Sequence, residues 1–262
     1  MSVNLSNTKR IVIKVGSSTL TGQAGANLDP TAIDKLVDVV GKLKADGKEI
    51  IIVSSGAIAA GLAPLGLSAR PTDLTSQQAA ASVGQGLLMA KYTQSFNRFK
   101  ITTSQLLITL DDINKANHVE NIKGVLNSLL KQGVVPIINE NDTTSTDEIK
   151  FGDNDILAAQ IATLIKADHL ILLSNVDGLY KEPPKTNKND DLIKEVKSIT
   201  NRIRDMAGVA SKLGKGGMIS KIKAAEICMK SKCSVIITSG LKDNPIKSLG
   251  NKKTKSTKFI AK

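Results

Sequence analysis

Three short segments combine glycine with lysine or serine where the sequence pattern changes. Lys14-Val15-Gly16 ends the first apolar run, Ser55-Gly56 follows the second, and Gly214–Lys221 (GKGGMISK) opens a helical pattern. Glycine lets the backbone approach an anion, a helix start offers free N–H groups, and lysine adds positive charge. If the three segments face one crevice, they predict a site for a phosphoryl donor and an anionic acceptor.

The most acidic segment of the chain, Asn139–Asp155, raises the alternative of a metal site. It holds six carboxylates in a chain whose formal net charge is +12. An EF-hand calcium loop starting at Asn139 would need glycine at its sixth position and glutamate at its twelfth. Those positions hold Thr144 and Lys150, so a dedicated calcium loop is not predicted. The pair Asp147-Glu148 is expected to lie in a solvated loop.

Two familiar nucleotide-binding motifs are absent from the sequence. A P-loop requires G-x-x-x-x-G-K-[ST], whereas Gly208 and Gly214 are one residue too far apart and Lys215 is followed by glycine. Gly84-Gln85-Gly86 starts like a dinucleotide fingerprint, but it lies inside a helical pattern and Leu87-Leu88-Met89 follows it. Neither motif is therefore predicted, and the glycine-rich helix start is the feature that supports phosphate binding.

Short apolar runs rich in β-branched residues alternate with helical patterns along the chain. This order predicts an α/β fold, a three-layer αβα sandwich around a mainly parallel sheet with right-handed crossovers. The expected strands are Arg10–Val15, Glu49–Ser54, Thr102–Thr109, Val134–Asn139, His169–Ser174 and Ser234–Thr238. The expected helices are Asp29–Lys44, Ala57–Gly61, Ser76–Phe99, His118–Lys131, Asn154–Lys166 and Gly217–Lys230, with Asp29 and Asp153 as N-caps of the first and fifth.

Ligands of such folds bind beyond the carboxyl ends of the strands. Polar or glycine-rich segments follow four of the expected strands, namely Lys14–Ser18, Ser54–Ala57, the acidic segment and Ser174–Gly178. The candidate binding residues are therefore expected to gather at one edge of the sheet.

The composition is that of a globular protein, with 41% hydrophobic and 23% charged residues. No apolar run approaches the roughly 18 residues of a membrane span, and Met1–Arg10 lacks the apolar stretch of a signal peptide. We expect one domain over residues 1–262, in the cytoplasm and without a membrane partner. Cys228 and Cys233 have no histidine nearby, and His118 and His169 are isolated, so neither a zinc site nor a Ser/His triad is predicted.

Half of the excess positive charge lies at the end of the chain. Leu241–Lys262 contains seven lysines and one aspartate, and a basic tail of this kind can bind nucleic acid. Six aromatic residues in the whole chain offer little for stacking on bases. Anionic small molecules are an alternative partner for a basic surface.

Five motifs occur in order along the chain. They are Ile11–Ser18 (IVIKVGSS), Ser54–Gly61 (SSGAIAAG), Ile138–Asp142 (INEND), Glu148–Asp155 (EIKFGDND) and Leu213–Lys221 (LGKGGMISK). Together they resemble the glutamate 5-kinase family of the amino acid kinase superfamily, over about residues 10 to 240. The resemblance implies transfer of the γ-phosphoryl group of ATP to the side-chain carboxylate of L-glutamate, giving γ-glutamyl phosphate, the first intermediate towards proline.

The resemblance also implies which residues form the site. Lys14 and Lys221 are expected to neutralise charge on the transferring phosphoryl group, and Asp155 to hold their two ammonium groups. The residues expected to bind or adjoin glutamate are Ser55, Gly56, Asn139, Asp142, Asp153 and Asn154. The residues expected to contact ATP, besides Lys14, are Ser174, Asn175, Lys215, Gly216, Gly217, Met218, Ile219, Ser220 and Lys221. Mg²⁺ is expected to bridge the phosphates, with no side chain assigned to it.

The chain departs from the family pattern at two positions of the glycine-rich loop. The family usually has a hydroxyl where this chain has Lys215 and a polar residue where it has Ile219, which bears on nucleotide preference. Many relatives append a C-terminal PUA domain, which we do not expect here. The basic tail is expected to close the sheet with a strand at Thr254–Ile260, whose Phe259 packs inward. Longer relatives form dimers and tetramers and are feedback-regulated, so a homo-oligomer is expected and proline is a candidate feedback inhibitor.

Two alternative functions stay open. One is another carboxylate kinase of the superfamily, acting on N-acetylglutamate or aspartate. An N-acyl substrate has no ammonium group and would leave Asp142 and Asp153 without a charge partner, which argues against it. The other is a nucleic-acid-binding regulator on a kinase-like scaffold, which the tail Leu241–Lys262 motivates.

Overall fold

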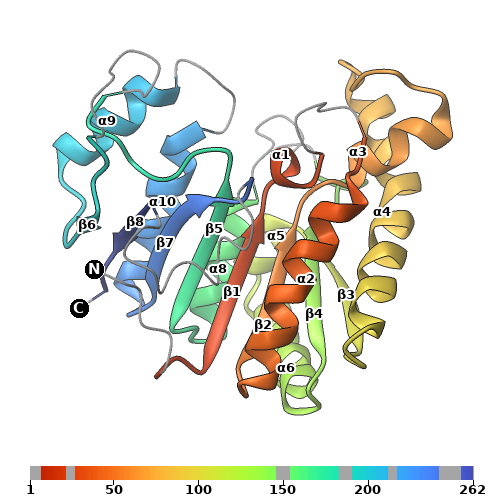
Figure 1. The fold of residues 1–262 in the computed structure, drawn as a ribbon, viewed down its shortest axis with the longest axis horizontal. Coiled ribbons are helices and arrows are strands. Elements are labelled where there is room, and N and C mark those ends of the chain that lie inside the picture. The colour runs from red at the N-terminus through yellow and green to blue at the C-terminus, as the bar shows by residue number, and fades with distance from the viewer. Residues whose placement is uncertain are drawn as a thin grey trace.

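An eight-stranded sheet forms the centre of the structure, with strand order β3-β4-β2-β1-β5-β7-β8-β6 (Figure 1). The computed structural model describes residues 7–21, 27–145, 154–182, 191–211, 217–241 and 255–261. The strands are β1 (Arg10–Val15), β2 (Glu49–Ser54), β3 (Thr103–Ile108), β4 (Val135–Glu140), β5 (His169–Ser174), β6 (Glu195–Val196), β7 (Ser234–Ser239) and β8 (Ser256–Phe259). Among the strand pairs of the described residues, only β7 and β8 are antiparallel. The mainly parallel sheet is therefore confirmed.

Helices cover both faces of the sheet, which confirms the three-layer sandwich (Figure 1). On one face, α2 (Pro30–Ala45) and α4 (Leu74–Asn97) pack through side chains such as Val37 and Tyr92. The other face is covered by α6 (Ala116–Lys131), α8 (Asp155–Leu164) and α10 (Gly217–Lys230). The remaining helical segments are α1 (Ser17–Leu20), α3 (Ala57–Leu62), the 3₁₀ turn η1 (Ala63–Leu65), α5 (Leu110–Asn114) and α9 (Asn201–Ser211).

The start of α2 is as predicted, whereas the start of α8 is not. The Asp29 side chain accepts a hydrogen bond from the backbone N–H of Thr31 at 2.9 Å, and Pro30 is the first helical residue. At α8 the N-cap is Asn154, which has non-helical backbone angles (φ −76°, ψ 12°). The prediction that Asp153 caps this helix is therefore wrong. Asp153 itself lies outside the described residues.

The pleat of each strand decides which helices its side chains meet. In β1, Ile11 and Ile13 belong to the core beneath α2 and α4, whereas Val12 belongs to the core beneath α8 and α10. Because side chains alternate along a strand, Lys14 points to the same face as Val12. By the same alternation Ser54 of β2 points towards α4, where its hydroxyl lies 2.9 Å from the hydroxyl of Tyr92.

The strand expected near the C-terminus is present as β8, but it does not close the sheet. The two-residue strand β6 pairs outside it, with Val196 opposite Phe259. A strand of two residues has no readable alternation, so β6 was not expected. Phe259 is fully buried, as predicted. Of the expected range, Thr254 lies outside the described residues.

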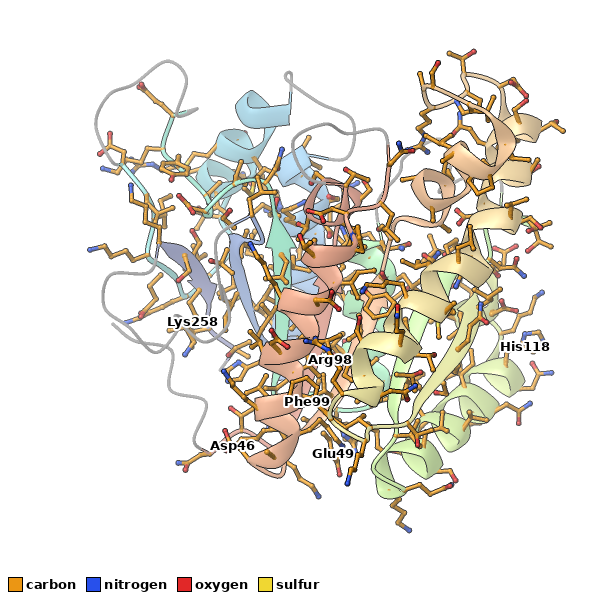
Figure 2. The ribbon with its side chains drawn as sticks, turned by 45° about the vertical axis from the view of Figure 1, so that its right-hand side comes forward. Asp46, Glu49, Arg98, Phe99, His118 and Lys258 are labelled. Atoms are coloured by element: carbon orange, nitrogen blue, oxygen red, sulfur yellow. The ribbon has the colours of Figure 1, made fainter. Side chains whose placement is uncertain are left out.

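The amino ends of the strands are closed by charged pairs and by packing between α2 and α4. Arg10 Nε donates a hydrogen bond to Glu49 Oε2 at 2.7 Å. Glu49, Arg98 and Phe99 lie in the lower half of the molecule in Figure 2. A Cβ at Gly41 of α2 would lie 2.6 Å from the Phe99 ring, so any other residue here would force this ring to shift. These contacts are structural, and binding residues are expected at the opposite end of the sheet.

No helix in the described part of the chain is long and apolar enough to cross a membrane.

Candidate active site

A buried carboxylate, that of Asp155, lies between two lysines that come from distant parts of the chain. Lys14 Nζ of β1 is 2.6 Å from Asp155 Oδ1, and Lys221 Nζ of α10 is 2.9 Å from Asp155 Oδ2. The side chain of Asp155 has no exposed surface, and those of the lysines are 6% and 11% exposed. We call these three residues the Lys–Asp–Lys cluster. It carries one positive charge in excess and so favours an anion beside it.

Small residues bring α8 and α10 close enough to form this cluster. Ala158 and Ala159 of α8 and Ala224 and Ala225 of α10 are buried in the same core, and small side chains let two helix backbones approach each other. In α10, Lys221 and Ala225 are four residues apart and therefore lie on one face of the helix.

Ser220, which is expected to contact the nucleotide, also lies beside the Lys–Asp–Lys cluster. Its hydroxyl donates to Asp155 Oδ2 at 3.0 Å and lies 3.0 Å from the carbonyl oxygen of Gly217. Ser220 therefore stabilises the same carboxylate oxygen as Lys221 and connects it to the first residue of α10.

A chain of side-chain amides lies beyond the ends of β2 and β4. Asn154 Nδ2 donates to Asn139 Oδ1 at 2.8 Å and to the carbonyl oxygen of Ser54 at 3.1 Å, and it lies 3.3 Å from Ser55 Oγ. Asn139 Nδ2 donates in turn to Gln85 Oε1 of α4 at 2.9 Å. Three of the residues expected to bind the substrate, Ser55, Asn139 and Asn154, are thus directly connected.

Two glycines let α4 lie against α3 and so near this chain of amides. A Cβ at Gly84 would lie 1.9 Å from the Ala57 carbonyl oxygen, and one at Gly61 would lie 1.9 Å from the Ala80 carbonyl oxygen. Both helix backbones are in contact there. Gly56 precedes α3 with φ 108°, a left-handed conformation that favours glycine. The glycines of the motif SSGAIAAG therefore serve a turn and a helix crossing.

Asp142 follows β4 and is half-buried. Burial and the nearby carboxylate of Glu140 raise its pKa to about 6, against the opposing effect of Arg70. Its loop is attached to α4, since Gln78 Nε2 donates to the carbonyl oxygen of Thr143 at 3.2 Å. A partly buried carboxylate at this place can bind an ammonium group and loses that ability when it is protonated.

The residues expected to contact the nucleotide are only partly described. Ser174 at the end of β5 is buried, with its hydroxyl 3.3 Å from Asn175 Oδ1, and Asn175 is exposed. Gly217 is the first residue of α10, Met218 is buried, and Ile219 is 39% exposed. The remaining predicted residues, Asp153, Lys215 and Gly216, lie outside the described residues.

The isolated histidines and cysteines belong to other parts of the molecule. His118 lies at the right-hand side of Figure 2, on α6, and its Nδ1 is 2.9 Å from Asp112 Oδ1. Cys228 and Cys233 are free and buried, as expected of small apolar residues. Over the described ranges, no three His, Cys, Asp or Glu side chains gather as metal ligands would.

The family model described as "Amino acid kinase family" matches residues 9–239. The chain belongs to the amino acid kinase family. The match covers β1 to β7 and includes all three residues of the Lys–Asp–Lys cluster.

Members of this family with high similarity to the chain carry the name glutamate 5-kinase. The one from Streptomyces coelicolor is 50% identical over 235 residues, which cover 89% of this chain and 62% of that protein. The one from Clostridium acetobutylicum is 46% identical over 259 residues, which cover 98% of this chain and 97% of that protein. The chain thus spans less than two thirds of the first relative and nearly all of the second.

A solved structure of low sequence similarity shares the fold. The crystal structure of UMP kinase from Ureaplasma parvum matches with a TM-score of 0.62 at 19% identity, covering 97% of this chain and 99% of that one. The sheet and its helices are therefore an amino acid kinase fold.

Sequence reasoning missed Gln85 and Tyr92, both on α4, as neighbours of the site. In the sequence, Gln85 belongs only to an incomplete dinucleotide motif. The neighbouring Gly84 could have indicated a helix contact at this position, since a glycine inside a long helix often marks a close approach of another backbone.

Proposed function

We propose that this family member transfers the γ-phosphoryl group of ATP to the γ-carboxylate of L-glutamate, which is the first step of proline biosynthesis. The observation that carries the proposal is the convergence of Lys14 and Lys221 on Asp155 at the carboxyl end of β1. The names of the relatives of 43–50% identity support it.

The two lysines supply the charge that phosphoryl transfer requires. Catalysis of this reaction depends on positioning and on neutralising negative charge rather than on covalent participation of the protein. Asp155 holds both ammonium groups at fixed positions, so their positive charge is oriented before the substrates bind. Lys14 and Lys221 then neutralise the phosphoryl oxygens as charge moves towards the leaving ADP.

No general base is needed for this reaction. The γ-carboxylate of glutamate is ionised at neutral pH, so its oxygen attacks the γ-phosphorus directly. The new P–O bond forms while the bond from phosphorus to the ADP oxygen breaks, and no proton is transferred. Accordingly, the side chains gathered here are cations, amides and carboxylates.

In this proposal, the end of β4 and the start of α8 bind the amino acid. Asp142 binds the α-ammonium group, and Ser55 and Asn154 bind polar groups of glutamate. N-acetylglutamate has no ammonium group and would leave the carboxylate of Asp142 unpaired, which costs binding energy. On this ground we propose glutamate rather than N-acetylglutamate as the substrate.

The proposed reaction also requires ATP and Mg²⁺. Asp155 is already bound by two lysines, so it is not offered as a metal ligand, and the phosphates of ATP are the expected ligands of the ion. When bound, Mg²⁺ neutralises phosphate charge. Homo-oligomerisation, proline inhibition and a cytoplasmic location stay predictions.

The decisive experiment is a hydroxamate assay. The purified chain is incubated with ATP, Mg²⁺, glutamate and hydroxylamine, and γ-glutamyl hydroxamate and ADP are measured. Parallel reactions with N-acetylglutamate and aspartate decide among carboxylate kinases. A folded sample that forms neither hydroxamate nor ADP with glutamate would refute the proposal.

A further inference from the structure

The amide chain Gln85–Asn139–Asn154 has a direction that two backbone groups determine. Asn139 Oδ1 accepts from the backbone N–H of Glu140 at 2.9 Å, and Asn154 Nδ2 donates to the carbonyl oxygen of Ser54 at 3.1 Å. Reversing both asparagine amides would place a donor against the Glu140 N–H and an acceptor against the Ser54 oxygen. Neither backbone group can change its nature, so only one direction satisfies both.

In this direction Asn139 must donate towards α4, and Gln85 supplies the acceptor. Asn139 is only 3% exposed, so its N–H group depends on a protein partner there. Gln85 Oε1 lies 2.9 Å away. A buried donor without an acceptor is costly, so without this oxygen Asn139 would be held less firmly, while the backbone groups would still set its direction.

The other end of the chain of amides is Asn154, which has no hydrogen bond to its oxygen among the described residues. Its nitrogen donates to Asn139, Ser54 and Ser55, so its oxygen is the part of the amide that can accept a hydrogen bond from a ligand. Asn154 is also the N-cap of α8, directly before Asp155 in the chain. The residue that carries this acceptor is therefore the sequence neighbour of the Lys–Asp–Lys cluster.

We propose that Gln85 is a positioning residue for substrate recognition: its hydrogen bond from Asn139 satisfies the buried end of the amide chain and so fixes the place of Asn154, whose oxygen binds an N–H donor of the substrate. This inference rests on the proposed function, in which that donor is the α-ammonium group of glutamate. Gln85 itself does not touch the substrate.

The place of Gln85 on α4 fits this role. Gln78, seven residues earlier on the same face of the helix, donates to the carbonyl oxygen of Thr143 in the loop that carries Asp142. One face of α4 thus contacts both segments that are proposed to bind the ammonium group. The backbone contact at Gly84 fixes the distance between α4 and α3, the helix that follows Ser55 and Gly56.

The test compares Gln85→Met, which keeps the length of the side chain but removes the acceptor, with Gln85→Glu, which keeps an acceptor oxygen. Assays at pH 8 keep Asp142 ionised in both variants. We expect Gln85→Met to raise the KM and the calorimetric Kd for glutamate about tenfold or more, the range for a hydrogen bond to a charged group. The kcat and the KM for ATP should stay within about twofold of wild type, and Gln85→Glu should restore most of the affinity.

Two controls separate positioning from general structural damage. Gln94→Met makes the same change on the exposed face of α4 and should leave every constant unchanged. Glutarate, which lacks the ammonium group, should inhibit wild type and Gln85→Met with the same Ki. If Gln85→Met does not fold, Gln85→Ala removes the same acceptor.

The outcomes distinguish the two proposals. An unchanged affinity for glutamate in Gln85→Met, or an equal loss for glutarate and glutamate, would overturn the role of Gln85 and leave the proposed function intact. A wild-type chain that binds glutamate without phosphorylating it would refute the proposed function and still test Gln85 through Kd. Wild type that does not bind glutamate at all would overturn both.

Discussion

Lys14 and Lys221, one near each end of the chain, bind different oxygens of the same carboxylate, Oδ1 and Oδ2 of Asp155. The two ammonium groups are thereby held close together in the interior of the protein. Without the carboxylate they would repel, and each would need another partner. Two predictions follow from this arrangement, a third concerns the carboxylate of Asp142, and a fourth concerns the glycines of α4.

Replacing the carboxylate of Asp155 should lower both stability and activity. Asp155→Asn keeps the shape but leaves two ammonium groups beside a neutral amide. We expect the free energy of unfolding to fall by about 3–5 kcal/mol, the range for breaking a buried ion pair, and kcat to fall at least about a hundredfold. Urea unfolding and the hydroxamate assay measure the two effects. Asp34→Asn, which breaks a half-exposed pair with Lys91, should leave kcat unchanged; equal kcat values for the two variants would contradict the prediction.

Removing the ammonium group of Lys221 should affect the chemical step. Lys221→Met keeps the aliphatic stem, and we expect a loss of about 10²–10³ in kcat, as for other donors to a transition-state anion. Lys223→Met is the control, because Lys223 lies two residues further along α10 and is exposed. Steady-state kinetics with saturating substrates measure both. Near-normal turnover by Lys221→Met would remove this lysine from the mechanism.

Glutamate affinity should depend on the ionisation of Asp142. Burial and Glu140 raise the pKa of Asp142 to about 6, so the carboxylate is ionised above pH 6 and becomes neutral as the pH falls below it. The KM for glutamate should therefore rise about tenfold between pH 7 and pH 5, at saturating ATP. Asp142→Asn should have a high KM at every pH in this range. A flat wild-type profile down to pH 5 would show that this carboxylate does not bind the ammonium group.

Two glycines of α4 should respond in opposite ways to the same substitution. In Gly84→Ala the new Cβ would lie 1.9 Å from the Ala57 carbonyl oxygen, whereas nothing lies within 4 Å of a Cβ at Gly86. We expect Gly84→Ala to lower the free energy of unfolding by about 1–3 kcal/mol, and Gly86→Ala to raise it by up to about 1 kcal/mol through helix propensity. Thermal and urea unfolding compare them, and equal stability of the two variants would argue against the backbone contact between α3 and α4.

The elements that carry a regular pattern could be predicted from the sequence. The continuous apolar runs predicted the strands of the parallel sheet, and their carboxyl ends predicted where Lys14 and Ser55 would lie. The meeting of Lys221 with Asp155 was expected only from the family resemblance, because no local pattern connects two residues so far apart. The structure agrees with that expectation.

Contacts between helices could not be predicted in the same way. The role of Gly84 depends on the path of α3, and the contact of Gln85 depends on that crossing. Similarly, Asp and Asn are both common N-caps, and the sequence cannot show that the Asn154 side chain is hydrogen-bonded to Ser54, Ser55 and Asn139 and makes no capping bond to α8. The strand β6 is too short to have a pattern, and its pairing with β8 is a tertiary contact.

The central place of β1 in the sheet also has a consequence for biosynthesis. β1 pairs with β2 on one side and with β5 on the other, and the backbone N–H of Lys9 donates to Asp168 across 159 residues of chain. A ribosome releases β1 long before residues 169–174, so one edge of an apolar strand has no neighbour during most of translation. The nascent chain should therefore need a chaperone on β1 more than on any later strand, and that need should end when β5 emerges.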